Sequence, residues 1–204
     1  MYFDPFAESE VILADERLGW GMEWRLTQDY IVNVPEWFQK RYKVTAQVLA
    51  PAGMLHDARS SPSLVSPFLP RQNPCTPADV IHDALYRMSR IINWLEGEIQ
   101  RAKATGYIGT EGHLREILHV CIRVREAWTR KASDDFYFVH RKAMAKNAPI
   151  PLIGFRHPKN TRLGQWAGRS ASWAGVRIGG WPFWQASPHE GFPSYVDKLA
   201  ERYG

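Results

Sequence analysis

The chain of 204 residues is poor in cysteine and has no long apolar run, and each absence excludes a class of protein. Cys75 and Cys121 are too few for the disulfide framework of a small secreted domain, so a reducing compartment is expected. No apolar stretch approaches the roughly 20 residues that a membrane-spanning helix needs. The first five residues, 1–5, lack the charged and apolar regions of a secretory signal. The sequence therefore predicts a protein without a membrane span.

Common nucleotide, zinc and nucleic-acid signatures are missing as well. The chain contains no P-loop and no G-x-S-x-G, and its histidines and cysteines lack the spacing of zinc ligands. A net charge of +5 with scattered arginines is mild for a nucleic-acid binder, so no specific nucleic-acid partner is predicted. One denser basic group is suited to a phosphate or an anionic lipid surface: Arg156, His157, Lys159 and Arg162.

Aromatic residues are abundant at 13%, which excludes a disordered chain and favours a packed core. Tryptophan and glycine concentrate in residues 150–204, where no helical period appears before a short terminal helix near 195–199. We interpret 150–204 as an irregular segment or arm. Its aromatic residues would either pack on the rest of the domain or contact other proteins.

The remaining chain divides into a β-rich and a helical part. Alternating or clustered apolar residues predict short strands at 24–27, 30–34 and 42–48. From Thr76, apolar residues recur every three or four positions and predict one helix of about 25 residues, followed by helical runs to about 146. The sequence predicts an α+β fold, in which a small antiparallel sheet in the N-terminal third packs on two or three long helices. Residues 1–149 would form this domain, with β and loop structure over 1–75 and helices over 76–149.

The motif best suited to chemistry is His82-Asp83, which lies in the first turns of the predicted helix. Tyr86 follows His82 by four residues and shares its helix face. A partly buried histidine beside a carboxylate can act as a general base when another group holds its second ring nitrogen. An antiparallel helix carrying Asp134 and Asp135 would bring one of these carboxylates to His82. The simpler interpretation is a hydrogen-bonded histidine in the core.

Two enzyme families resemble this order of residues. His56-Asp57, His82-Asp83 and the later aspartates resemble the H…HD…D order of HD-superfamily phosphohydrolases, although His56 lies outside any helical pattern. His82, Asp83, Tyr86 and an aspartate about fifty residues on resemble the His-Asp-x-x-Tyr helix of phospholipase A2. This resemblance implies that His82 activates water and that Asp83 helps to hold Ca²⁺. The chain lacks that family's glycine-rich calcium loop and its disulfides.

The chain also resembles a phage and prophage family of unknown function. The resemblance covers about residues 22–180 and rests on four motifs. These are Pro51-Ala52-Gly53-Met54 through Asp57 to Pro62, Ala78-Asp79 through His82-Asp83 to Tyr86-Arg87, Ser133-Asp134-Asp135-Phe136-Tyr137-Phe138, and Trp173-Ala174-Gly175-Val176-Arg177. In the family's pattern an aspartate precedes a phenylalanine by three residues, which favours Asp135 over Asp134 as the partner of His82. The resemblance implies a phage origin, synthesis in the host cytoplasm, a place in the virion, and other phage proteins as partners.

Two functions are therefore expected for the chain. In the first, a phage-encoded protein carries a hydrolase-like site in which His82 is the general base and Asp135 orients it. Asp83 would be a metal ligand, Tyr86 a supporting donor, and Asp57 would join from its loop. In the second, the same polar cluster only fastens the fold, and the protein is a structural or assembly component of the tail or head–tail region.

Overall fold

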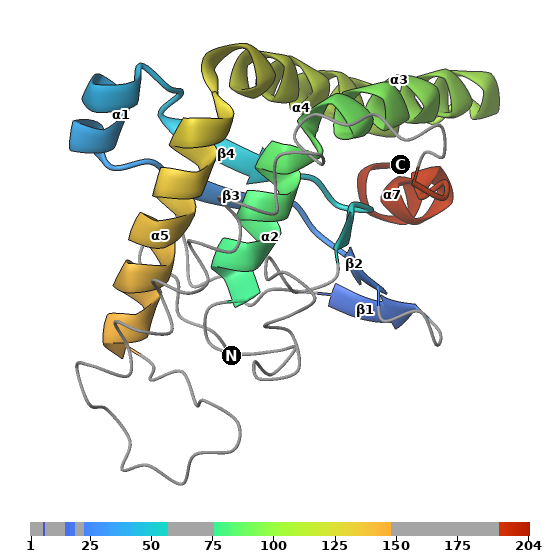
Figure 1. The fold of residues 1–204 in the computed structure, drawn as a ribbon. Coiled ribbons are helices and arrows are strands. Elements are labelled where there is room, and N and C mark those ends of the chain that lie inside the picture. Colours follow the sequence, from blue (N-terminus) through green and yellow to red (C-terminus); the bar gives the residue numbers. More distant parts are fainter. Residues whose placement is uncertain (1–5, 7–14, 19–22, 57–75, 148–191) are drawn as a thin grey trace, which may run out of the picture.

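A computed structural model describes residue 6 and residues 15–18, 23–56, 76–147 and 192–204 (Figure 1). Asp57, Cys75, the basic group at 156–162, the motif at 173–177 and the tryptophans of 150–191 lie outside the described residues. In the described part, no helix combines the length and apolar character that crossing a bilayer requires.

The β structure consists of two small antiparallel sheets. Their strands are β1 (Asp15–Leu18), β2 (Glu23–Leu26), β3 (Tyr30–Asn33), β4 (Gln47–Ala50) and β5 (Leu55–His56). One sheet has the order β1-β2-β5, and the other pairs β3 with β4 so that Tyr30 lies opposite Ala50. Within β3 the side chains of Tyr30 and Val32 are buried, whereas Ile31 is half-buried and Asn33 is exposed. This alternation is the one expected of a strand with one face on the core.

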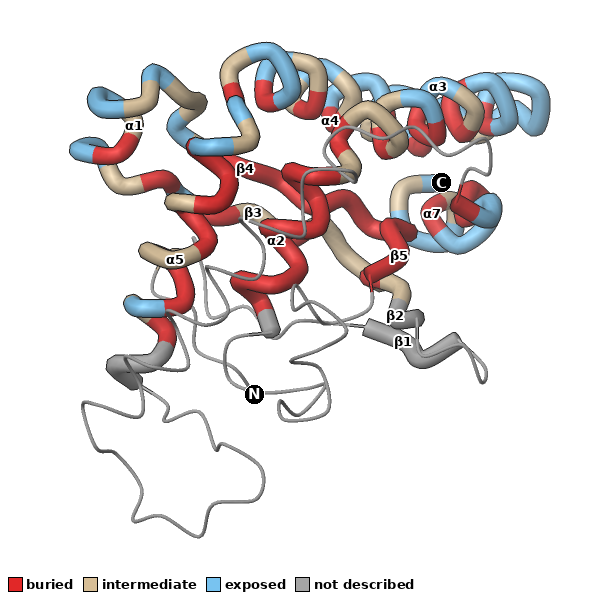
Figure 2. Tube along the Cα trace, viewed as in Figure 1, coloured by how far each residue is buried: buried red, intermediate tan, exposed pale blue. Residues whose placement is uncertain are grey.

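The helices form two antiparallel pairs that meet over the β3–β4 sheet. They are α1 (Glu36–Tyr42), α2 (Thr76–Tyr86), α3 (Met88–Thr105), α4 (Ile108–Ala127), α5 (Arg130–Asn147) and α7 (Val196–Tyr203). Helix α2 packs against α5, α3 packs against α4, and both α2 and α4 contact β4 (Figure 1). Buried positions follow α2 and β4, while the outer faces of α3 and α4 are exposed (Figure 2). The α+β class predicted from the sequence is confirmed.

The predicted single helix of about 25 residues is wrong, because the chain bends at Arg87 (φ −104°, ψ 16°) and forms α2 and α3. The guanidinium of Arg87 donates a hydrogen bond to the carbonyl of Leu55 in β5, 3.2 Å away. The bend directs α2 toward α5 and α3 toward α4. Helix α3 ends at Thr105, because Gly106 follows it in the left-handed conformation (φ 77°).

The strand predicted over 42–48 is wrong in its first half. Tyr42 ends α1, Lys43 follows in the left-handed conformation (φ 55°), and the strand begins at Gln47. Helix α1 buries Phe38, which stacks on Tyr42 with ring centroids 4.4 Å apart. This aromatic packing extends to Trp128 at the end of α4, whose Nε1 donates to Thr45 Oγ1 at 2.8 Å.

Gly53 sits in the turn before β5 at a point where a side chain has no room. Its φ is +86°, and a Cβ there would lie 2.7 Å from Trp94 Cη2 and 2.9 Å from Tyr195 Cβ. The turn therefore requires glycine for its backbone conformation and for the close approach of two aromatic residues.

We expect Gly53→Ala to lower the free energy of unfolding by about 2–4 kcal/mol, because a strained backbone conformation adds to overpacking. Gly112→Ala is the matched control, since Gly112 lies in α4 with no neighbour within 4 Å of an added Cβ. That control should be neutral or stabilising by up to about 1 kcal/mol. Urea unfolding followed by circular dichroism measures both variants, and equal effects would contradict the tight turn.

Candidate functional site

The candidate site lies between α2 and α5, which run antiparallel. Contacts along the pair show the direction: Asp79 meets Tyr137, His82 meets Asp134, and the hydroxyl of Tyr86 also reaches Asp134. Because His82 and Tyr86 are four residues apart in α2, both side chains point to the same turn of α5. The structure thus places beside His82 a carboxylate from a segment 52 residues downstream.

Asp134 is the acid that faces His82. Its side chain is fully buried, and its Oδ1 accepts a hydrogen bond of 2.5 Å from the Tyr86 hydroxyl and lies 3.4 Å from His82 Nε2. Its other oxygen lies 3.9 Å from Nη1 of Arg130, one turn earlier in α5. These groups give the buried carboxylate partners from both helices, as a buried charge requires.

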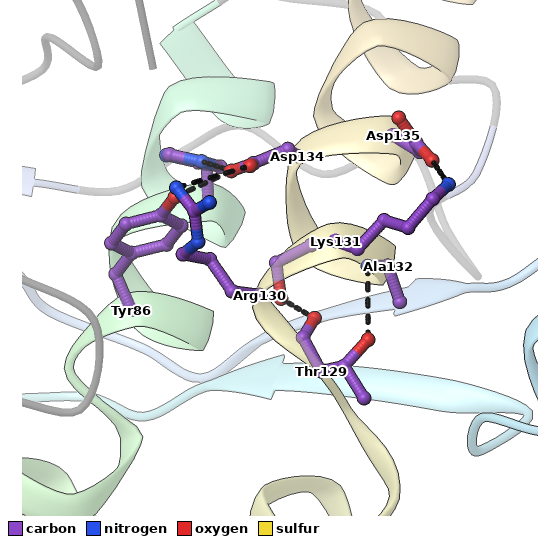
Figure 3. Close-up of polar contacts among 9 residues, drawn as sticks. Tyr86, Thr129, Arg130, Lys131, Ala132, Asp134 and Asp135 are labelled. Atoms are coloured by element: carbon purple, nitrogen blue, oxygen red, sulfur yellow. Dashed lines mark hydrogen bonds and ion pairs between the residues drawn. The ribbon is translucent and has the colours of Figure 1, made fainter. Parts of the chain in front are cut away.

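Asp135 does not orient His82, which corrects the assignment made from the spacing to Phe138. It accepts hydrogen bonds from the Tyr42 hydroxyl at 2.6 Å and from Lys131 Nζ at 2.7 Å. Figure 3 shows Asp134 directed from α5 toward Tyr86, whereas Asp135 points away from α2 toward Lys131. Successive helical residues are about 100° apart, so only one of the two aspartates can face α2.

His82 is enclosed by two tyrosine rings. The ring centroids of Tyr86 and Tyr137 lie 4.3 Å and 4.6 Å from that of the imidazole, and His82 is 4% exposed. Because a carboxylate only accepts hydrogen bonds, His82 Nε2 must carry the proton that is shared with Asp134. In the described part of the chain, Nδ1 makes no hydrogen bond. This nitrogen is the one available to take a proton from another group.

A second buried polar cluster adjoins His82, and sequence reasoning missed it. Tyr137 donates to Asp79 Oδ1 at 2.6 Å, and Arg141 Nη1 donates to the Tyr137 hydroxyl at 2.6 Å. Arg141 Nη1 also lies 3.4 Å from Asp79 Oδ1, which makes a buried ion pair. The only signal in the sequence was the i, i+4 spacing of Tyr137 and Arg141 in one helix.

The two tyrosines of these clusters stay protonated. Burial raises the pKa of Tyr86, and the hydrogen bond to the Asp134 carboxylate raises it further. Burial also raises the pKa of Tyr137 well above its ordinary value, with Asp79 adding to the effect. Both hydroxyls therefore act as hydrogen-bond donors to aspartate at neutral pH.

A metal site is not assembled in the described part of the chain. Asp83 is 7% exposed in α2, but no group of three or more histidine, cysteine, aspartate or glutamate side chains there is arranged to hold a metal ion. Asp57, the other candidate, lies outside the described residues. His56 is fully buried in β5, where it pairs with Trp24 of β2. The described residues thus fit neither the calcium site nor the phosphohydrolase site that the two resemblances imply, and no step is derived through a metal.

The central part of the fold matches a known family. Residues 24–147, from β2 to the end of α5, match the model of DUF1353, a family of proteins of unknown function. The chain belongs to the DUF1353 family. No curated protein and no solved structure matches the chain. The family match contains both polar clusters. In this DUF1353 protein, residues 192–204, which include α7, lie beyond the end of the match.

We expect Tyr86→Phe to lower the free energy of unfolding by about 1–3 kcal/mol, because Asp134 would lose a donor inside the core. Tyr42→Phe is the matched control, since it removes a similar bond to Asp135 at a partly exposed site. That loss should be below about 1 kcal/mol. Urea unfolding measures the free energy of unfolding of both variants. A larger loss of stability in Tyr42→Phe than in Tyr86→Phe would contradict the importance of the buried bond to Asp134.

The buried His56 makes stability depend on pH. Burial, and then the neighbouring Arg87 cation, lower the pKa of His56 from 6.5 to about 4. Between these values the unfolded chain binds a proton that the folded chain does not. Stability from this group is therefore complete above pH 6.5 and falls as the pH drops toward 4, by about 3 kcal/mol.

We expect His56→Gln to flatten this dependence, whereas His119→Gln, which alters an exposed histidine of α4, should leave it intact. Urea unfolding at pH 7 and at pH 4.5 measures the difference for each protein. A His56 variant with the same loss as the unaltered chain would show that other groups set the acid sensitivity.

Proposed function

We propose that this DUF1353 protein is a hydrolase in which His82 is the general base and Asp134 orients it. The observation that carries the proposal is the shared carboxylate oxygen of Asp134, which meets both His82 Nε2 and the Tyr86 hydroxyl. Tyr86 fixes the carboxylate, the carboxylate holds the Nε2–H tautomer, and Nδ1 keeps its lone pair. A histidine held in this way is suited to removing a proton from water.

The reaction that fits these groups is the hydrolysis of an ester. His82 Nδ1 takes a proton from water as the water oxygen bonds to the carbonyl carbon. The imidazolium then returns that proton to the leaving alkoxide as the carbon–oxygen bond breaks. Asp134 accepts the hydrogen bond from Nε2 throughout and stabilises the positive charge on the ring.

The resemblance to phospholipase A2 supports the same roles. It implies a histidine that activates water, a tyrosine one turn later, and an aspartate on an antiparallel helix, and these positions are His82, Tyr86 and Asp134. The calcium that this family holds is not part of the proposal, because the described residues around Asp83 form no metal site.

The biological setting is part of the proposal and rests on the resemblance to a phage and prophage family. We propose that the protein is phage-encoded, is made in the host cytoplasm, and acts there or in the virion alongside other phage proteins. A phosphate or anionic lipid surface would meet the basic group of Arg156, His157, Lys159 and Arg162.

The test uses the full-length protein with 4-nitrophenyl butyrate, bis(4-nitrophenyl) phosphate and phosphatidylglycerol vesicles, each with CaCl₂ or with EDTA. We expect ester turnover that falls about 100-fold or more in His82→Gln and in Asp134→Asn. His113→Gln is the matched control, because His113 of α4 also pairs with a carboxylate, Asp29, at 3.0 Å. This variant should keep full activity. A folded protein without turnover on any of the three substrates, or full activity in His82→Gln, would overturn the proposal.

A second candidate function is a non-catalytic structural or assembly component of a phage particle. The observation that favours it is burial, since His82 is 4% exposed and Asp134 is fully buried among hydrogen-bonding partners. Such a network can stabilise one arrangement of helices without performing chemistry. In that case His82→Gln would lower the urea midpoint, and no substrate would be turned over by the unaltered chain.

A further inference from the structure

The last residues of the chain, 192–204, pack against a face built by α3, α4 and the Gly53 turn. Helix α7 contacts α4 and α3 and lies at the edge of the molecule (Figure 1). Its residues fall outside the family match, which ends at 147. The family match therefore includes α3 and α4, which form this face, but not the segment that packs on it.

Glu98 of α3 is the polar anchor of this face. Its carboxylate is fully buried and accepts hydrogen bonds from the Tyr195 backbone N–H at 2.8 Å and the Ser194 hydroxyl at 3.1 Å. Arg101, one turn further along α3, also donates to Glu98 through Nε at 2.8 Å. Because Arg101 comes from the same helix, the charge of Glu98 is balanced whether or not the segment is present.

Two aromatic residues of the segment meet cations and rings of the core. The guanidinium of Arg90 lies 4.3 Å from the ring centroid of Phe192, which also meets Trp94 edge to face at 5.7 Å. Arg25 lies 5.1 Å from the ring centroid of Tyr195. Aromatic anchors beside arginine are typical of the centre of a binding interface.

The end of α7 fits the first turn of α4 closely. A Cβ on Gly109 would overlap the Tyr203 carbonyl oxygen, so the contact depends on glycine. The Tyr203 ring stacks on His113 at 3.8 Å, and His113 in turn pairs with Asp29. Between the Glu98 contact at Tyr195 and the His113 contact at Tyr203, the side chains of Val196 and Leu199 are buried.

The segment has the properties of a ligand for this face. Helix α7 has 8 residues, and helices shorter than about 12–15 residues are marginal in water, so its order depends on docking. Its anchors are spaced as Phe-x-Ser-Tyr-Val-x-x-Leu over 192–199. In this pattern an extended part, whose Tyr195 backbone N–H donates to Glu98, is followed by a short helix with one apolar face. Peptides that bind through one apolar helix face are a common mode of recognition.

We propose that the α3–α4 face is a peptide-binding face and that its ligand is the C-terminal segment 192–204 of the same chain, bound reversibly. This face recognises Phe192 and Tyr195 through Arg90, Arg25 and Glu98.

The experiment measures binding of a fluorescein-labelled peptide with the sequence of residues 192–204 to full-length protein by fluorescence anisotropy. In the double variant Phe192→Ala/Tyr195→Ala the binding face is unaltered and the chain's own segment binds it more weakly, so the peptide should bind. The unaltered chain should bind it at least about tenfold more weakly, because its own segment competes. Adding Gly109→Ala to the double variant should abolish binding, whereas adding Gly112→Ala should not.

Equal peptide binding by the unaltered chain and the double variant, no binding by a folded double variant, or equal effects of the two glycine changes would overturn the proposal. If the double variant does not fold, a full-length chain with a protease site inserted after Ser170 is folded and then cut. The released fragment should stay with the core on gel filtration and leave when excess peptide is added. A fragment that excess peptide never displaces would overturn reversible docking. Concentration-dependent dimers in sedimentation would overturn docking within one chain, because the segment would then come from a second copy.

Discussion

The buried carboxylate of Asp134 is the constraint on which the arrangement of α2 and α5 depends. A charge in the core is stable only when donors surround it, and here the donors come from both helices: Tyr86 and His82 from α2, and Arg130 from α5. Sliding one helix along the other by a turn would leave this carboxylate without the Tyr86 hydroxyl. The pair Asp79–Arg141 repeats the same logic one turn further along. Polar groups therefore fix the register between α2 and α5, which apolar packing alone would specify less strictly.

Much of this arrangement is visible in the sequence because it follows local periodicity. The helical spacing from Thr76 onward, the shared face of His82 and Tyr86, and the terminal helix after Tyr195 are all local features. The break at Arg87 is not, because the apolar period continues through it and the bend depends on a contact with Leu55 in a distant strand. Helix α1 also has no signal in the sequence. The residues from Tyr42 onward alternate like those of a strand, and the helix is stabilised by the burial of Phe38 against distant residues.

The sequence alone could not show whether Asp134 or Asp135 faces His82. The two residues are adjacent and chemically identical, and only the rotation of α5 decides which one meets α2. A pattern of residue types favoured Asp135, but Tyr42 and Lys131 occupy that side of the helix. The Asp79 cluster could not be predicted because its three members come from two helices whose register was unknown.

The proposed role of His82 depends most directly on which of its ring nitrogens carries the proton. Long-range ¹H–¹⁵N NMR of ¹⁵N-histidine-labelled protein at pH 8 reports the tautomer of each ring, with His82→Gln providing the assignment. We expect His82 to be protonated at Nε2, toward Asp134, with Nδ1 unprotonated. A His82 ring protonated at Nδ1 with a bare Nε2 would contradict the account, since that nitrogen cannot donate to a carboxylate and could not be the oriented base proposed for this fold.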